Sequence, residues 1–378
     1  MRRVIRNLQP TCQGGIVPMT KLLALGGDGI GPEILDQGLR VLDRVAETGG
    51  LSFDIEHDVL HGAAWDRHGT FCTEDVLRKA KASDALLVGA VGGPQWDDIR
   101  VPGGAERQDG LMYLRRQLQT FLGLRPARSW TALRHRSPLR PDILGEADVM
   151  ILREMCGGAM FAAERGIDTA GGKRRGYDMT AYDEVEIARF ARGGFALARR
   201  RRARLVSCDK SNVMESYRLW REVVTEVAGE FPDVDFTSMF ADNCAYQLMM
   251  RPQDFDVVIC CNQLGDLLSD LAGVYTGSLG MLPSACLAAP SQDGPVFGIY
   301  ESTSGSAPDI AGKGIANPVG MILSVGMMLD HSLARPDLAA LVQQAVEKAL
   351  DDGFATPDIG GRHGSAEFAD AVIERLSP

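Results

Sequence analysis

Short apolar runs alternate with helix-like patterns along the chain from about residue 21 onward. Runs typical of buried strands occupy positions 22–25, 85–88, 149–152, 205–208 and 255–261. Between them, apolar residues recur at helical spacing over positions 32–47, 110–122 and 184–200. Such alternation is typical of α/β proteins, and no repeat with a period of about 20–50 residues is visible. The pattern predicts an α/β fold.

The composition is that of a globular protein. With 378 residues, 45% of them hydrophobic and 24% charged, the chain is long enough for two lobes, and it is unlike a disordered or fibrous protein. The formal net charge of −10 disfavours nucleic acid or an anionic membrane surface as a partner. We predict that the basic run at 199–202 is the solvated end of the helix 184–200, where cations suit the helix dipole.

Cysteine usage and the lack of a long apolar run indicate the cellular compartment. The eight cysteines show no C-x-x-C spacing and several lie in apolar runs, which predicts reduced structural thiols in a cytoplasmic protein. No run approaches the roughly eighteen uninterrupted apolar residues of a membrane helix, so we expect no membrane partner. Residues 1–18 contain three arginines, no acid and Pro10. We expect them to form a disordered tail, or to reflect a start upstream of Met19, rather than a transit peptide.

Two carboxylates follow the apolar run 255–261 directly. Asp266 and Asp270 are four residues apart in the string NQLGDLLSD, so on a helix they share one face. Two hard oxygen ligands on a first helical turn suit Mg²⁺ or Mn²⁺. The alternative is an exposed acid pair that only complements the helix dipole.

Several further strings occur in an order that resembles one family. They are GDGIGPE at 27–33, LRR at 114–116 with LRP at 124–126, RE at 153–154, DKSNV at 209–213, DN at 242–243, and GSAPDIAGKGIANP at 305–318. Together with the acid pair they resemble the β-decarboxylating dehydrogenases, the family of 3-isopropylmalate, isocitrate, homoisocitrate and tartrate/D-malate dehydrogenases. Within these motifs the sequence is most similar to the isopropylmalate branch. The resemblance runs from about residue 21 to the C-terminus, and its last string is highly specific.

The resemblance implies a two-lobed α/β fold of the isopropylmalate dehydrogenase type. It is not a Rossmann fold, since no G-x-G-x-x-G follows a strand. A cofactor-side lobe would comprise residues 19–120 and 277–378, and a metal and dimerisation lobe residues 121–276. The loop-like segment at about 155–182 would form an arm that clasps a second subunit, so a homodimer with shared active sites is implied.

Three arginines lie in or beside apolar segments. Burying Arg115, Arg125 and Arg153 is costly unless each meets an anion, so the set predicts a polyanionic ligand. Guanidinium groups pair with carboxylates bidentately, and the resemblance implies that these positions grip the two carboxylates of a malate-type 2-hydroxy acid. Taken singly, each arginine could instead form an ordinary ion pair.

Two apolar residues precede Arg115 on its predicted helix. Leu111 and Met112 lie four and three residues earlier, on the same face. A third substrate carboxylate buried there would lack a partner, so we expect an alkyl, aryl or absent group at the third carbon of the substrate. The alternative is that both are ordinary core residues.

The resemblance implies oxidation of the substrate hydroxyl followed by decarboxylation. Asp266 and Asp270 would hold the metal, with Asp242 contributed by the other subunit. Lys210, at the end of the apolar strand 205–208, is the candidate base, because a partly desolvated lysine near cations can have its pKa lowered. Asn212 would position the cofactor or the substrate. A surface lysine in a turn is the alternative for Lys210.

The glycine-rich string implies the cofactor site. By the resemblance it wraps the adenosine half of NAD, and Asp309 would accept hydrogen bonds from the ribose hydroxyls and repel a 2′-phosphate. Ile310 stands where NADP-using relatives carry a phosphate-binding tyrosine, so NAD is expected. The expected contacts are Ser304, Gly305, Ser306, Ala307, Asp309, Ile310, Asn317 and Asn212. Without the resemblance, the string indicates only a turn-rich connection.

Four positions depart from the family pattern. Met160 replaces a tyrosine whose hydroxyl helps to protonate the enol, and a thioether has no proton to give. Ser304 replaces a histidine that packs on adenine, Gln108 an acid, and Ala90 a small hydroxyl residue. These changes suggest a divergent paralogue.

Three functions follow. The leading one is metal- and NAD-dependent oxidative decarboxylation of a 3-substituted malate, with 3-isopropylmalate as the first candidate. The second is oxidation of D-malate, tartrate or another malate-type acid with slow or absent decarboxylation. The third, a catalytically silent regulatory subunit, is disfavoured because such a subunit would be free to lose the arginines, Lys210 and the acids.

Overall fold

One large sheet runs through the whole molecule. The computed structural model describes residues 2–5, 19–291 and 294–376. In spatial order the strands are β1 (Arg2–Ile5), β3 (Ser52–Asp58), β2 (Met19–Leu25), β4 (Ala85–Val88), β13 (Gly298–Ser302), β12 (Pro283–Leu287), β5 (Leu122–Arg128), β6 (Asp148–Glu154), β11 (Val257–Cys260), β9 (Arg204–Asp209) and β10 (Asp235–Phe240). The predicted α/β fold is therefore confirmed.

The sheet joins two parts of the chain at its centre. Strands β1 to β4, β12 and β13 come from the two chain ends, and β5, β6 and β9 to β11 come from the middle. The two groups meet where β12 pairs with β5, antiparallel, at Ala285–Leu124, Cys286–Gly123 and Leu287–Leu122. The division into two lobes stays a prediction.

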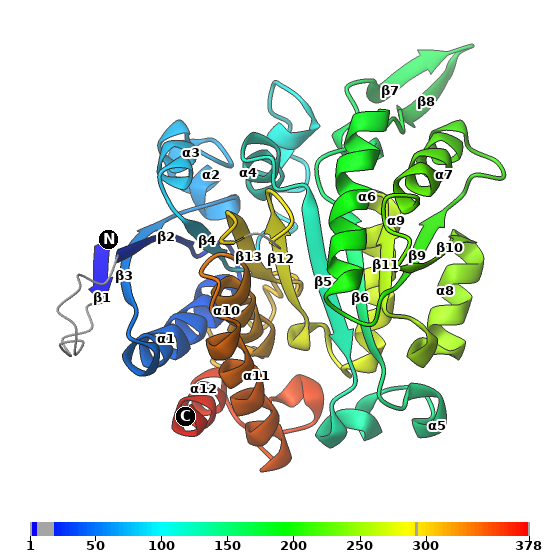
Figure 1. Ribbon diagram of the computed structural model, residues 1–378. Coiled ribbons are helices and arrows are strands. Elements are labelled where there is room, and N and C mark those ends of the chain that lie inside the picture. Colours follow the sequence, from blue (N-terminus) through cyan, green and yellow to red (C-terminus); the bar gives the residue numbers. More distant parts are fainter. Residues whose placement is uncertain (1, 6–18, 292–293, 377–378) are drawn as a thin grey trace.

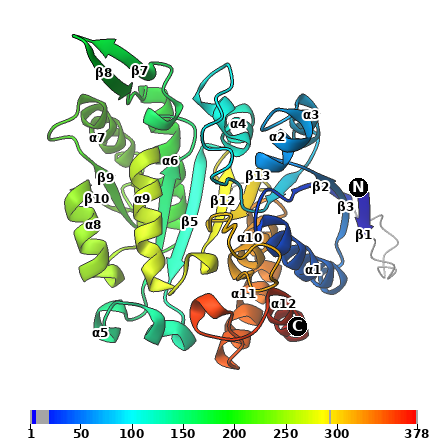
Figure 2. The same cartoon turned by 180° about the vertical axis from the view of Figure 1, so that it is seen from behind.

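Helices cover both faces of the sheet. They are α1 (Gly31–Gly49), α2 (Gly62–His68), α3 (Glu74–Lys81), α4 (Gly110–Gln117), α5 (Pro141–Leu144), α6 (Glu184–Arg199), α7 (Glu215–Ala228), α8 (Ala241–Met250), α9 (Asn262–Ala272), α10 (Val319–His331), α11 (Pro336–Asp351) and α12 (Ser365–Arg375). Figure 1 shows α6 and α10 in front of the sheet, and Figure 2, from behind, shows α9 in front of it. Short 3₁₀ turns include η3 (Ala159–Phe161), η6 (Leu279–Met281) and η7 (Pro357–Ile359).

Strand β2 shows how the sheet separates its cores. Leu22 and Ala24 pack in the cluster that includes α1, α10 and α11, whereas Leu23 and Leu25 pack in a second cluster with α3 and α4. Successive side chains of a strand point to opposite faces, so a continuous apolar run fits a strand covered on both sides. A third cluster lies around α8 and α9.

A two-stranded hairpin projects from the body of the molecule. Strands β7 (Arg165–Ala170) and β8 (Lys173–Asp178) pair only with each other, and nearly all their residues are exposed. The hairpin lies within the predicted arm at 155–182. Its contact with a second subunit stays a prediction.

One predicted helix is too long. The helix expected at 110–122 ends at Gln117, because Gln119 adopts a left-handed backbone conformation (φ 52°) and the chain then enters β5 at Leu122. The helices expected at 32–47 and 184–200 correspond to α1 and α6. The strands expected at 22–25, 85–88, 149–152, 205–208 and 255–261 correspond to β2, β4, β6, β9 and β11.

The first residues are not all a tail. Arg2–Ile5 form β1, which pairs antiparallel with β3 and covers an edge that would otherwise be open, and Arg3 pairs with Asp43 of α1. The prediction of a tail is wrong for these four residues. Residues 6–18, including Cys12, lie outside the described residues.

The basic run at 199–202 is more than a solvated helix end. Arg201 donates from Nε to Asp256 Oδ1 at 2.7 Å, and the backbone N–H of Arg202 donates to Asp256 Oδ2 at 2.8 Å. Asp256 is only 1% exposed, so these groups neutralise a buried carboxylate at the start of β11.

The described thiols fit the sequence prediction. The seven described cysteines are buried and free, which agrees with reduced structural thiols. Over the described ranges, no helix has the length and apolar character needed to cross a membrane.

Candidate active site

Two of the predicted substrate arginines converge on one buried acid. Arg115 of α4 and Arg125 of β5 are each 8% exposed. Arg115 pairs with Glu301 of β13, and Nη2 of Arg125 lies 3.7 Å from the same Glu301 carboxylate. The Nε atoms of both arginines are buried without a hydrogen-bond partner among the described residues. One acid therefore faces two guanidinium groups, which leaves an excess of positive charge that suits a further anion.

Arg153, the third arginine, connects β6 to α9. Its Nε donates to Asn262 Oδ1 at 2.8 Å, and its Nη1 pairs with Asp266. The close approach requires a glycine on α9, because a Cβ on Gly265 would lie 2.7 Å from Cβ of Arg153. Burial, and then the charge of Arg125, lower the pKa of Arg153 to about 10. The three guanidinium groups are therefore close enough for the charges of Arg115 and Arg125 to affect the pKa of Arg153.

The acid pair lies at this arginine cluster. Asp266 and Asp270 sit on successive turns of α9, as predicted. Partial desolvation and the charge of Asp266 raise the pKa of Asp270, while Arg125 and Arg153 lower it. Two carboxylates that repel each other suit a divalent cation, which would neutralise both.

The predicted metal ligands do not all meet within one chain. Among residues 2–5, 19–291 and 294–376, no group of three or more His, Cys, Asp or Glu side chains could hold a metal ion. Asp242 lies instead beside Lys210, whose Nζ donates to Asp242 Oδ1 at 2.7 Å. One chain alone therefore offers two of the three expected carboxylates at the arginine cluster.

The surroundings of Lys210 differ from the prediction. The Lys210 side chain is 32% exposed, as expected for a partly desolvated lysine, but the charge beside it is the carboxylate of Asp242, which is 72% exposed, and not a cation. The hydrogen bond from Lys210 lowers the pKa of Asp242. No arginine of the cluster reaches Lys210 by a hydrogen bond or ion pair within the described chain.

Leu111 is buried in the core, and its contact with the substrate stays a prediction. It is 3% exposed and packs with Leu60, Val76 and Leu114. Met112 is half-buried on the neighbouring helical position. Only Met112 retains exposed apolar surface on the Arg115 side of α4.

Five of the eight predicted cofactor residues line a cavity of about 590 Å³. Ser304, Gly305, Ala307, Ile310 and Asn317 line it. The opposite wall consists of Ile30, residues of η6, and Pro357 and Asp358 of η7. The glycine-rich segment therefore forms one wall of a hollow and not only a connection, and its contact with a cofactor stays a prediction.

The loop before α1 fixes one side of this cavity. The backbone N–H of Ile30 donates to the carbonyl of Ser306 at 2.8 Å. Gly29 has φ 54°, and a Cβ there would lie 1.9 Å from the same carbonyl oxygen, so only glycine permits the contact. The carboxylate of Glu33 accepts hydrogen bonds from the N–H groups of Gly314 and Ala316. The strings at 27–33 and 305–318 are thus parts of one structure.

Three of the expected cofactor residues do not line this cavity, and their role stays a prediction. Ser306 is buried and Asp309 is exposed beside Ile310, and neither lines the cavity. Asn212 is exposed in the turn between β9 and α7 and also lies outside the cavity lining. The side chain of Asn317 donates to Asp358 at 3.0 Å and accepts from the N–H of Val319, so it already shapes the cavity wall.

The four departures have local explanations of different kinds. Met160, in η3, places its sulfur 3.3 Å from Nη2 of Arg153, so the substitution lies at the arginine cluster. The Gln108 amide donates to the carbonyl of Val101 at 2.7 Å and accepts from its N–H, and an acid could not donate this bond. Ser304 bonds Ser302 at 2.8 Å. Ala90 packs tightly beneath the loop before α1, with its carbonyl accepting from Asp28 N–H.

Three residues at these sites were not predicted: Glu301, Asn262 and Asp358. A lone acid in the apolar run of β13 is a signal that could have identified Glu301, since a buried charge needs a partner. Asn262 is 1% exposed and also donates to the carbonyl of Gly157 at 3.1 Å, which ties Arg153 to the segment that carries Met160.

Comparison with known proteins agrees with this geometry. Residues 21–372 match the Isocitrate/isopropylmalate dehydrogenase family. The chain is 46% identical over 361 residues to 3-isopropylmalate dehydrogenase of Xanthomonas oryzae pv. oryzae, covering 94% of this chain and 99% of the relative. It is 44% identical over 360 residues to 3-isopropylmalate dehydrogenase of Aquifex aeolicus, covering 94% and 97%.

A solved structure gives the same result for the fold. Isocitrate dehydrogenase from Methylococcus capsulatus aligns with a TM-score of 0.82 and 30% identity, over 95% of this chain and 99% of that one. The resemblance inferred from the motifs is confirmed, and the chain belongs to the isocitrate/isopropylmalate dehydrogenase family.

Proposed function

We propose that the protein catalyses the NAD- and divalent-metal-dependent oxidative decarboxylation of 3-isopropylmalate to 2-oxoisocaproate. The observation that carries the proposal is the meeting of Arg115, Arg125 and Arg153 with the Asp266 and Asp270 pair. This arrangement suits a small dianion that also contacts a cation. The relatives named 3-isopropylmalate dehydrogenase support this substrate over D-malate or tartrate, and they disfavour a silent subunit.

Each group of residues has a part in the proposed reaction. The guanidinium groups of Arg115 and Arg125 bind one substrate carboxylate, and that of Arg153 holds the other. Asn262 fixes the Arg153 guanidinium, so the substrate meets a preorganised site. When bound, the cation stabilises negative charge on the substrate oxygen, and NAD accepts the hydride.

The apolar surface near the arginines supports an alkyl group on the substrate. Met112 is half-buried on α4, and the thioether of Met160 adjoins Arg153. Neither side chain can pair with a third carboxylate, whose burial beside them would cost several kcal/mol. The isopropyl group of the substrate would lie against this surface.

We propose NAD rather than NADP, with Mg²⁺ or Mn²⁺ as the metal. Ile310 lines the cofactor cavity and offers a 2′-phosphate no hydrogen bond, and the neighbouring Asp309 is exposed and would repel it. The carboxylates of Asp266 and Asp270 fit a hard cation that prefers oxygen ligands.

A homodimer is proposed because one chain leaves the metal site incomplete. Tyr246 and Met250 of α8 and Leu267 of α9 are exposed apolar residues on adjoining helices, together with Ile167 and Tyr177 of the hairpin. A second copy would cover them and bring Asp242 of the partner subunit toward the acid pair. The buried free thiols suit a reducing compartment, and we propose the cytoplasm.

The test is to measure NADH formation and CO₂ release together, from (2R,3S)-3-isopropylmalate with NAD and Mn²⁺. We expect equal amounts of both, and much lower rates with isocitrate. Arg125→Met should raise KM at least about tenfold, since a charge-assisted hydrogen bond is lost. Arg140→Met, at an exposed position, is the matched control.

Other outcomes would contradict specific parts of the proposal. NADH without matching CO₂ would refute decarboxylation, and no NADH from any malate-type acid with folded protein would refute the dehydrogenase. A monomer with full activity, shown by light scattering at assay concentration, would refute the shared site.

A further inference from the structure

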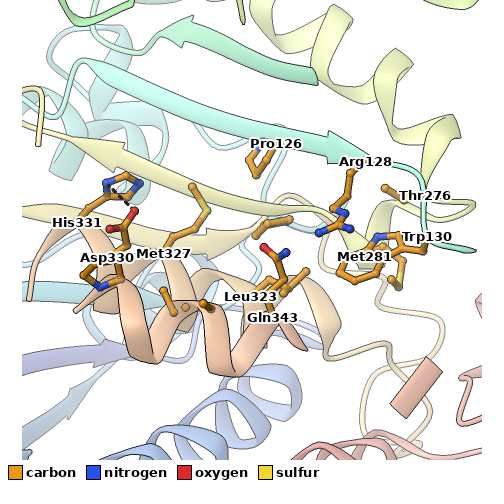
Figure 3. Close-up of a pocket in the computed structure, with 15 residues that line it drawn as sticks. Pro126, Arg128, Trp130, Thr276, Met281, Leu323, Met327, Asp330, His331 and Gln343 are labelled. Carbon is orange, nitrogen blue, oxygen red and sulfur yellow. Dashed lines mark ion pairs between the residues drawn. The ribbon is translucent and has the colours of Figure 1, made fainter. Parts of the chain in front are cut away.

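Two of the six histidines, His61 and His331, are buried, and the proposed reaction uses neither. Figure 3 shows His331 beside Asp330 at one end of a cavity of about 290 Å³ between β5 and helices α10 and α11. Its Nδ1 is bonded to Ser291 Oγ at 2.7 Å, and burial lowers its pKa, so a neutral ring suits this place. His61, by contrast, has surroundings that favour the charged form of its ring.

The backbone of His61 is strained. Its φ of 57° and ψ of −123° are the angles of the first central position of a type II′ turn, which glycine normally occupies. Residues with a Cβ that are held in such conformations cluster at functional sites. The backbone N–H of His61 donates to the carbonyl of Phe71 at 2.8 Å, and its carbonyl accepts from the N–H of Trp65. Glycine could make both bonds, so the reason for a histidine lies in its side chain.

The imidazole of His61 lies between two carboxylates. Its Nδ1 is 3.1 Å from Asp28 Oδ2, an ion-pair contact without the straight geometry of a hydrogen bond, and its Nε2 is 3.5 Å from Asp109 Oδ2. A neutral imidazole has one N–H, so its other nitrogen would turn a lone pair toward a carboxylate, whereas an imidazolium presents an N–H to each. His61 is 7% exposed and Asp28 is 4% exposed, so little water screens their charges.

The other groups around His61 agree with a charged ring. The rings of Phe71 and Trp96, with centroids 4.8 and 6.3 Å away, pack against it and carry no charge. Burial by itself lowers the pKa of His61, but the contact with Asp28 and the charges of Asp109 and Asp97 outweigh burial and raise the pKa above its usual value. The ring therefore keeps its proton to a higher pH than an exposed histidine does.

Asp28 is a fixed anchor for this contact. Ile30, two residues further on, donates its N–H to the carbonyl of Ser306 beside the cofactor cavity. Three backbone N–H groups donate to the carboxylate of Asp28 at 2.7 to 3.1 Å, those of Gly62, Ala63 and Gly92. The anchor is thus part of the loop that shapes the cofactor cavity.

Asp109 begins the helix that carries the proposed substrate residues. Its Oδ1 accepts from the N–H groups of Leu111 and Met112 at 2.7 and 2.8 Å, so this carboxylate caps α4. The start of α4 packs closely on the His61 segment, since a Cβ on Gly110 would lie 3.1 Å from the backbone nitrogen of His61. His61 therefore links the anchored Asp28 to the first turn of the helix that bears Arg115.

We propose that His61 is a positioning residue for the substrate. As an imidazolium between Asp28 and Asp109, it holds the start of α4 where Met112 and Arg115 meet 3-isopropylmalate. Loss of the ring proton removes the attraction to one carboxylate and releases the start of the helix, so the substrate binds less tightly. This inference rests on the proposed function, because it takes 3-isopropylmalate as the ligand.

The first test measures binding of 3-isopropylmalate to the full-length protein by calorimetry, with Mg²⁺ and without NAD, at about pH 6 and about pH 9. We expect the Kd of the wild-type protein to rise at least about fivefold between the two pH values, the lower end of usual coupling between sites. His61→Asn tolerates a positive φ but lacks the charge, so its Kd should change little with pH. His68→Asn, at an exposed position of the same helix, is the matched control and should behave as wild type.

The second test observes the imidazole itself by NMR, with the His61 signal assigned by its absence in His61→Asn. We expect the pKa of His61 to lie above about 6.5, the usual value for histidine. It should fall in Asp109→Asn, which keeps a helix cap but removes the charge. Bound 3-isopropylmalate should raise it, because coupling between a proton and a ligand is reciprocal. If His61→Asn does not fold, His61→Gly, which relieves the backbone strain, takes its place.

The results that would overturn the inference can be told apart from failure of the proposed function. A wild-type Kd that is equal at both pH values, or that changes equally in His61→Asn, would show that His61 does not position the substrate. A His61 pKa at or below about 6.5 would show that the ring is not held as an imidazolium. No binding of 3-isopropylmalate at either pH by any folded variant would contradict the proposed function, and this inference with it.

Discussion

Replacing Glu301 by glutamine tests whether the arginine cluster is held by one buried acid. Glu301 is 6% exposed and contacts both Arg115 and Arg125. Glutamine keeps the shape and one acceptor oxygen but removes the charge. The variant leaves two buried guanidinium groups without a counter-charge, which is the costly way to break a buried ion pair.

The expected loss follows from burial and chain length. Removing one partner of a buried ion pair typically costs about 3–5 kcal/mol. The unfolding entropy is about 2.1 cal/mol/K per residue, so 378 residues give about 0.8 kcal/mol/K. A loss of about 4 kcal/mol then lowers Tm by about 5 °C.

The assay is thermal unfolding with and without 3-isopropylmalate, in metal-free buffer at pH 7.5. Because the substrate carboxylate can replace the missing charge, we expect the ligand to raise Tm more in Glu301→Gln than in wild type. Glu230→Gln, which removes an exposed partner of Arg192, should change Tm by less than about 1 °C. A similarly small change in Glu301→Gln, or equal ligand effects in both proteins, would refute the reasoning.

Three further changes test other parts of the structure. Burial raises the pKa of Glu154 to about 7, so the folded state resists ionisation of this carboxyl. The free energy of unfolding of the wild-type protein should therefore decrease as the pH rises from about 4.5 to 7. Glu154→Gln should remove that slope in urea unfolding, and an unchanged slope would assign it to another group. Met160→Tyr restores a proton donor and should raise kcat for CO₂ release about tenfold or more, whereas equal rates in Met160→Tyr and Met160→Phe would show that no donor is needed there. Asp270→Asn should weaken Mn²⁺ binding at least about tenfold in a direct titration, while Asp254→Asn, an exposed control, should not, and equal affinities would refute the metal site.

The sequence predicts the buried strands better than the helix ends. Strands β4 and β11 are continuous apolar runs because both faces of the sheet are covered, and such runs are visible without any structure. The end of α4 is different. The left-handed conformation of Gln119 depends on how the chain enters β5, and no local residue preference signals it.

Contacts between side chains of the candidate site are also harder to predict from the sequence than the strands are. Asp266 was predicted from its spacing to Asp270, and Arg153 from its position beside an apolar segment, but neither prediction gave their pairing, which depends on how α9 packs beside β6. The pairing of Arg115 with Glu301 joins residues 186 positions apart, and periodicity carries no information on such a contact. The Lys210 contact with Asp242 was likewise unpredicted, because it depends on how β9 and α8 pack.

The order of strands in the sheet has a consequence for synthesis of the chain. Strand β4 finds its neighbour β13 only after residue 298 has been added, whereas β5, β6 and β9 to β11 are all complete by residue 260. At about 5–20 residues per second, the edge of β4 stays open for roughly 10–40 s on the ribosome. The middle of the chain can therefore fold before its beginning does. A truncated product that lacks β13 would leave one edge of β4 without a partner strand. Such an unpaired edge favours aggregation over folding.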